Sequence, residues 1–149
     1  MPTHHFEGTA VWSAGEPGAE QGNHTVTFDD RDSLAVSSAP QYRGDPTRLN
    51  PEELLTAAVV SCQLLTYLAL ARHAEVPVVR YEDNPVATLA MADRKMRVTE
   101  VLLRPEITLG AGADEEKARA LVEKAHENCF IANSVRCEVR IEPTFVPAA

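Results

Sequence analysis

The sequence predicts an α+β fold in which antiparallel sheets pack on a long buried central helix and a second helix. Three observations lead to this fold class. An apolar stretch of helical length occupies the middle of the chain, a second segment has helical amphipathic spacing, and short β-rich segments bounded by Gly, Pro and Asp flank both. At 149 residues, the chain is expected to form one domain, residues 1–149.

The first 37 residues predict a β-meander. Residues 6–13, 24–28 and 34–37 are short and rich in β-forming residues. Four glycines or prolines close the first of these segments, and the charged run at residues 29–32 closes the second. Three short strands joined by turns are therefore expected at the N-terminus.

Residues 50–72 predict the central helix, which is expected to end near residues 73–76, before Pro77. Pro51 suits the first helical position, Asn50 suits the cap, and Glu52 and Glu53 lie where the helix dipole favours anions. Residues 54–71 carry no formal charge, so we expect protein to cover this helix on most faces. The stretch also meets the length of a membrane span, but its Ala, Ser, Thr and Gln residues favour a core helix over that alternative.

The remaining elements follow from periodicity. Residues 78–91 and 96–109 predict an antiparallel strand pair that turns at residues 93–95. A second helix is expected from Asp114 to about Asn128, because its apolar residues recur every three or four positions. One further turn is expected at residues 131–135. Residues 135–145 alternate apolar and charged side chains, which predicts a final half-buried strand.

The charge balance, the N-terminal residues and the cysteine count limit the classes of protein to which this chain could belong. Fourteen basic against 22 acidic residues give a net charge of −8, which argues against a nucleic-acid partner. The N-terminal residues lack the charged and apolar regions of a signal peptide, so a cytoplasmic protein without a membrane span is expected. Three cysteines in such a chain suggest thiol chemistry, or no special role, rather than a structural disulfide framework.

The three cysteines differ in their surroundings. Cys137 lies on the apolar face of the final predicted strand and is interpreted as a core residue. Cys129 follows the polar end of the second helix, where we expect its side chain to be reachable. Cys62 lies inside the central helix, where a thiol ordinarily serves as a small apolar side chain. Cys62 and Cys129 form the pair best suited to redox chemistry.

The segments NPEELLTAAVVSC, YRGDP and CFIANSV resemble the OsmC and Ohr family of thiol-dependent peroxidases. The resemblance covers nearly the whole chain in element order. It implies that Cys62 is the peroxidatic nucleophile, that Cys129 is the resolving cysteine, and that Glu52 and Arg43 complete the site. An arginine shortly before the helix is the pattern of the OsmC branch, and Arg48 is the alternative to Arg43. The family often has CPVSNSL at the second cysteine, where this chain has CFIANSV.

The residue types suit this chemistry. Burial raises the pKa of a thiol, so a buried nucleophilic cysteine requires a fixed positive charge nearby, which an arginine supplies. Glu52 would hold the guanidinium in place, and we expect Glu53 to reach back to the helix cap. The apolar residues Leu64, Leu65, Tyr67 and Leu68 are expected to wall a substrate pocket.

The resemblance implies reduction of organic hydroperoxides to alcohols through a Cys62 sulfenic acid and a disulfide with Cys129. An external dithiol would then reduce this disulfide, and in the Ohr branch the reductant is lipoyl. No metal and no bound cofactor are expected.

Helix geometry adds one expectation about assembly. Glu52 and Cys62 on one straight helix are about 15 Å apart, too far to share a site within one chain. If two central helices cross in a twofold dimer, Glu52 of one chain can approach Cys62 of the other. We therefore expect a homodimer with two shared active sites.

Two other classes of protein compete with the peroxidase. His126 and Cys129 have a short metal-ligand spacing that Cys62, Cys137 and His73 could extend, which is a weak indication of a metal-binding protein. The altered segment after Cys129 instead allows a non-catalytic binding or stress-response protein of the same fold.

Overall fold

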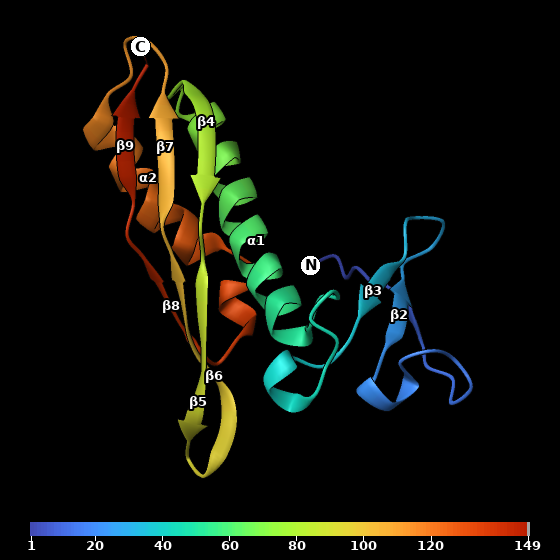
Figure 1. The fold of residues 1–149 in the computed structure, drawn as a ribbon. Helices are drawn as coiled ribbons and strands as arrows, with labels where there is room; N and C mark the ends of the chain where they lie inside the picture. The colour runs from blue at the N-terminus through green and yellow to red at the C-terminus, as the bar shows by residue number, and fades with distance from the viewer. Residues whose placement is uncertain (149) are drawn as a thin grey trace. The chain divides into compact units, whose positions relative to one another are not determined.

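The computed structural model describes residues 1–148. These residues divide into two compact units, residues 1–54 and residues 55–149, and each is described by itself below. Figure 1 labels the helices and strands.

The 1–54 unit contains the expected meander. Strands β1 (Thr9–Val11), β2 (His24–Thr27) and β3 (Leu34–Val36) form an antiparallel sheet in sequence order. Short 3-10 turns lie at Ala19–Gln21 (η1) and Pro40–Tyr42 (η2). The turn after β2 is confirmed, and its first residue, Asp29, has a left-handed backbone with φ 51°. The strands are shorter than the sequence predicts because their ends run into turns.

The loop before the central helix depends on a glycine. A Cβ on Gly44 would lie 1.6 Å from the backbone oxygen of Ser38, so no other residue fits without moving the backbone. Asp45 orders the same loop, since its carboxylate accepts hydrogen bonds from the Thr47 backbone and hydroxyl at 2.9 and 2.6 Å. Arg43 adopts a left-handed conformation at φ 65° immediately before this glycine.

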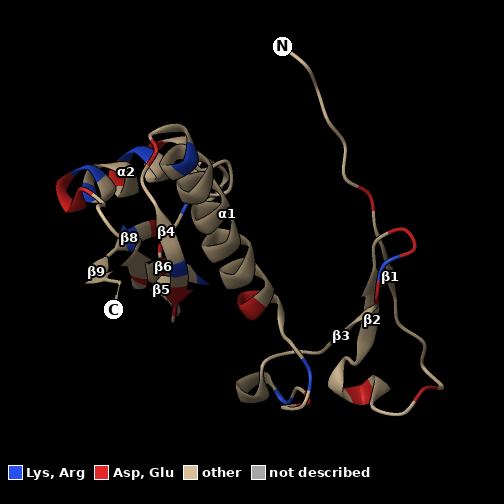
Figure 2. Cartoon of the chain, turned by 90° about the horizontal axis from the view of Figure 1, so that it is seen from above, with Lys and Arg blue, Asp and Glu red and all other residues tan. Residues whose placement is uncertain are grey.

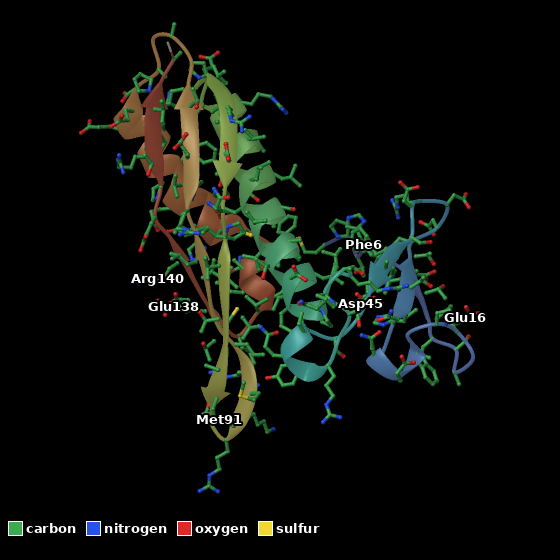
Figure 3. The ribbon with its side chains drawn as sticks, viewed as in Figure 1. Phe6, Glu16, Asp45, Met91, Glu138 and Arg140 are labelled. Carbon is green, nitrogen blue, oxygen red and sulfur yellow. The ribbon has the colours of Figure 1, made fainter. Side chains whose placement is uncertain are left out.

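Helix α1 (Pro51–His73) begins at the predicted first residue, and it ends within the predicted range of residues 73–76. Its start is a reciprocal capping box. The Glu53 backbone N–H donates to Asn50 Oδ1 at 2.9 Å, and the Asn50 N–H donates to Glu53 Oε1 at 3.1 Å. The predicted reach of Glu53 back to the cap is confirmed. Along its length the helix is uncharged between acidic residues at its start and basic residues at its end (Figure 2).

The 55–149 unit holds two three-stranded sheets. Strands β4 (Val78–Asp83), β7 (Pro105–Leu109) and β9 (Thr144–Pro147) form one, and β5 (Val86–Ala92), β6 (Lys95–Leu103) and β8 (Glu138–Ile141) form the other. Each long predicted strand is thus divided into two shorter ones. The hairpin of β5 and β6 is antiparallel and turns where predicted, and Asp93 and Arg94 adopt the left-handed conformation there.

Two strand pairs differ from the all-antiparallel expectation. β8 runs parallel to β6, and β9 runs parallel to β7. The physical reason is the connection between them, because helix α2 (Glu115–Asn128) carries the chain back along the sheet before β8 begins. The alternation predicted for residues 135–145 is confirmed, since β8 has alternating exposed and half-buried residues.

The core of this unit lies where α1 and α2 pack on the β4–β7–β9 sheet (Figure 1). Asp114 caps α2 by accepting from the Lys117 N–H at 3.2 Å, and the predicted apolar face of α2 is buried. Gln63 and Tyr67 of α1 donate hydrogen bonds to backbone oxygens of α2, at 3.2 and 3.1 Å. The buried residues of this core are Tyr67, Ala71, Val76, Ile107, Leu109, Ala118, Leu121, Val122 and Ala125.

The expectation that protein covers α1 on most faces is wrong for the single chain. Its buried residues, Val59, Gln63, Tyr67 and Ala71, recur at intervals of four and form one stripe. Leu65, on another face, is 65% exposed. By length and composition α1 could cross a membrane, and 22% of its most apolar stretch is buried; the core helix of a soluble protein passes the same test.

Candidate functional site

Cys62 and Cys129 come together within the 55–149 unit. Cys62 lies half-buried near the middle of α1, and Cys129 caps the C-terminal end of α2. Both are free thiols, and their sulfur atoms are within hydrogen-bonding reach of each other. Two helices distant in sequence thus place one pair of thiols side by side.

Hydrogen bonds favour the thiolate of Cys62. Burial by itself raises the pKa of Cys62, but hydrogen bonds from the Ile131 backbone N–H, the Cys129 thiol, the Thr66 hydroxyl and the Phe130 backbone N–H outweigh it. The net result is a pKa below the ordinary value for cysteine. Cys62 is therefore the better nucleophile of the pair.

The backbone N–H of Ile131 is the most important of these donors. The Thr66 hydroxyl has a single hydrogen, and it donates that hydrogen to the Cys62 carbonyl oxygen at 2.8 Å. The N–H groups of Phe130 and Ile131, by contrast, donate to no backbone oxygen among the described residues. The short turn η3 (Ala132–Ser134) follows them, so the segment after α2 directs several N–H groups towards the two sulfur atoms.

The pKa of Cys129 is shifted in the opposite direction, above the ordinary value for cysteine. Burial raises its pKa, as does the hydrogen bond that its thiol donates to Cys62, and the Ala132 N–H, which donates to its sulfur at 3.4 Å, offsets this only in part. The prediction that the Cys129 side chain is reachable is wrong, since Cys129 has no exposed surface. It caps α2 with its side chain turned inwards, and the neighbouring Phe130, 81% exposed, points outwards instead.

Sequence reasoning missed these donors. Thr66 lies one helical turn after Cys62 and could have been found from that spacing. The amides of Phe130 and Ile131 could not, because every residue other than proline has a backbone N–H and only the fold decides where it points.

The predicted Arg43 and Glu52 belong to the 1–54 unit, and their placement beside the thiols stays a prediction. Arg48 is already engaged within that unit. It donates to the His24 carbonyl oxygen at 3.1 Å and pairs with Asp45 at 3.8 Å. Arg43 is exposed and forms no ion pair or side-chain hydrogen bond with residues 1–148. Of the two arginines, Arg43 is thus the one free to bind another group.

The expected apolar pocket wall is wrong in part. Tyr67 is fully buried, and Leu68 packs against the same core. Leu65 faces outwards. Tyr67 belongs to the buried stripe of α1, and Leu68 is half-buried beside it.

Metal ligands do not gather in the described part of the chain. Among residues 1–148, no group of three His, Cys, Asp or Glu side chains lies close enough to hold a metal ion. Cys137 is half-buried and packs against a small cluster of Val59, Val101 and Leu103, which agrees with its interpretation as a core residue.

The fold and the site define a class: mixed α+β proteins that hold a pair of free thiols between two helices. The sequence profile of the OsmC-like protein family matches residues 44–144, and the chain belongs to this family. An uncharacterized protein, YmaD from Bacillus subtilis (strain 168), is 22% identical over 95% of this chain and 93% of its own.

Solved structures of the same fold include two informative neighbours. An OsmC-like protein of unknown function from Vibrio cholerae is 29% identical, with a TM-score of 0.86 over 95% of this chain and 99% of that one. A protein from Elizabethkingia anophelis named as an organic hydroperoxide resistance protein is 20% identical, with a TM-score of 0.74 over 99% of each chain. At that identity the second likeness shows the fold alone.

Proposed function

We propose that this protein is a thiol-dependent peroxidase that reduces organic hydroperoxides to alcohols in the cytoplasm. The observation that carries the proposal is the pair of free thiols, one with a lowered and the other with a raised pKa, within one compact unit. Lowering the pKa of one thiol and raising that of the other separates a nucleophile from a proton donor. Membership of the OsmC-like family supports the same reaction class.

The first step oxidises Cys62. Its thiolate attacks the terminal oxygen of the hydroperoxide, an S–O bond forms as the O–O bond breaks, and the alkoxide leaves with a proton as the alcohol. Cys62 becomes a sulfenic acid. The Cys129 thiol, which donates its hydrogen bond towards Cys62, would supply this proton.

The second and third steps restore the enzyme. Cys129 attacks the Cys62 sulfur, water leaves, and a disulfide forms. An external dithiol then reduces this disulfide by two successive exchanges and is itself oxidised to a disulfide. The protein needs no metal or bound cofactor for these steps.

We propose that a second copy of the chain completes the site. Apart from its buried stripe, α1 presents apolar and small residues that are exposed within the 55–149 unit, and small side chains allow two helices to approach closely. These residues are Ala57, Ala58, Ser61, Leu65 and Ala69. In a twofold dimer Glu52 and Arg43 of one chain would approach Cys62 of the other. The arginine would stabilise the thiolate and the lengthening O–O bond.

Peptide mass mapping after one equivalent of tert-butyl hydroperoxide tests the chemistry. A disulfide between Cys62 and Cys129 is expected, and Cys129→Ser should instead leave a Cys62 sulfenic acid that dimedone traps. Cys137→Ser is the matched control and should form the disulfide as the wild type does. An unmodified Cys62 in wild-type protein would exclude the peroxidase and favour a non-catalytic binding protein of the same fold.

A subunit-mixing experiment tests the shared site. Cys62→Ser and Glu52→Ala proteins, each inactive alone, are mixed under conditions in which subunit exchange is verified by mass. Activity should appear in the mixture, because heterodimers contain one intact composite site. No activity despite exchange would contradict the shared site, and a monomer that requires detergent would favour the membrane alternative for α1.

A further inference from the structure

A hollow of about 370 Å³ lies in the 55–149 unit, apart from the thiol pair. It is formed by the start of β6, the segment before β8 and one residue of α1, Leu55. Its volume lies within the range of small-molecule sites, about 300–1,000 Å³. The residues that line it are Leu55, Lys95, Met96, Arg97, Val98, Val135, Arg136 and Cys137.

The lining combines two kinds of side chain. Leu55, Val98 and Val135 are half-buried and apolar, and Cys137 joins them. Lys95, Arg97 and Arg136 bring three positive charges, in a chain whose net charge is −8. None of the lining residues is acidic. A local cluster of cations beside an apolar surface is complementary to a ligand that has one anionic end and one apolar end.

Arg97 has bonding capacity that the protein leaves unused. Its Nε is buried without a hydrogen-bond partner among the described residues. Its Nη2 lies 3.9 Å from Asp93, and its Nη1 donates to the Val98 carbonyl oxygen at 3.5 Å, at the limit of a hydrogen bond. The planar guanidinium is thus held loosely, and a carboxylate could be bound by two of its N–H groups at once.

We propose that this hollow binds a small amphipathic carboxylate, with the carboxylate against Arg97 and its neighbouring cations and the alkyl chain against Leu55, Val98 and Val135. The site is separate from the thiol pair and does not depend on the peroxidase reaction. Leu55 and Cys62 lie two turns apart on α1, about 10 Å along its axis. A ligand in the hollow would therefore contact the helix that carries Cys62.

Cys137 provides a built-in reporter for occupancy, since its thiol lines the hollow. In the Cys62→Ser/Cys129→Ser protein it is the sole thiol, because the chain has three cysteines. The rate of its alkylation by N-ethylmaleimide is measured with decanoate, kept below its micelle concentration. Decan-1-ol, with no charge, and acetate, with no alkyl chain, are the comparison compounds. Circular dichroism verifies that the double variant is folded.

Decanoate is expected to slow the alkylation, with decan-1-ol and acetate each at least about tenfold less effective. Arg97→Gln should raise the decanoate concentration for half-protection about tenfold, through loss of a charge-assisted hydrogen bond. The matched control is Arg94→Gln, which removes the same charge from the same hairpin at a residue that does not line the hollow. It should change the half-protecting concentration less than twofold.

Three results would overturn the proposal. If decan-1-ol protects Cys137 as well as decanoate does, the hollow is only an apolar surface that does not recognise an anion. Equal changes in the half-protecting decanoate concentration for Arg94→Gln and Arg97→Gln would mean that the ligand responds only to the overall charge of the hairpin, and not to a direct contact with Arg97. Cys137 that is unreactive without ligand, and becomes reactive on dilution, would show that a second copy of the chain covers the hollow.

Discussion

Cys129 donates a hydrogen bond to Cys62, and this one contact moves the pKa values of the two thiols in opposite directions. The proton shared by the pair stays on the buried sulfur, and the sulfur on the central helix is left with more thiolate character. Together with the amides of Phe130 and Ile131, this contact favours the Cys62 thiolate through hydrogen bonds.

The first prediction concerns the pH dependence of alkylation. The pKa of Cys62 lies below that of free cysteine, so its thiolate forms at lower pH, and its alkylation rate should rise earlier than that of a free thiol. Cys129, with its raised pKa, should react only at higher pH. Iodoacetamide labelling with peptide mass analysis across a pH series measures both. Equal profiles for Cys62 and free cysteine would contradict the proposed nucleophile.

The second prediction isolates a backbone donor. Ile131→Pro removes the N–H that bonds to Cys62, and the native φ of −72° suits proline. The pKa of Cys62 should rise by about one pH unit, because one hydrogen bond to a charged group is lost. Ile131→Ala is the control, since it shortens the side chain but keeps the N–H. The idea fails if both variants shift the alkylation profile equally.

The third prediction compares buried Tyr67 with half-buried Tyr81, whose ring centroids lie 5.8 Å apart. The Tyr67 hydroxyl donates to the Ala118 carbonyl oxygen at 3.1 Å, whereas the Tyr81 hydroxyl is buried with no partner among the described residues. Tyr67→Phe should lower the free energy of unfolding by about 1 kcal/mol, and Tyr81→Phe should leave it unchanged or slightly raise it. Urea unfolding of the two variants decides. A larger loss from Tyr81→Phe would reveal a partner for that hydroxyl.

The fourth prediction follows from a half-buried carboxyl. Burial raises the pKa of Asp83, so folding favours its protonated form and the ionised form lowers stability at neutral pH. This penalty should disappear as the pH falls through the raised pKa. Asp83→Asn keeps an oxygen to accept the Arg104 N–H, which donates to Asp83 at 2.8 Å. The variant should be more stable than the wild type at neutral pH.

The control for this prediction is Glu106→Gln, a change at an exposed residue of the neighbouring strand. Its stability relative to the wild type should vary little with pH. Unfolding midpoints measured from pH 3 to 8 give both comparisons. An advantage of Asp83→Asn that grows towards acid pH would have the wrong sign and would refute the assignment.

The sequence by itself determined the order of the helices and strands and the choice of Cys62 and Cys129 as the thiol pair. The limits of α1, its capping box at Asn50 and Glu53, and the buried face of α2 follow from local spacing and capping, which neighbouring residues decide. Tertiary structure alone decided the parallel pairing of β8 with β6, the burial of Cys129 and the donors around Cys62. Those features depend on the path that the chain takes after α2. Nearly every residue has a backbone N–H, so the sequence cannot indicate which of these groups will point at a sulfur atom.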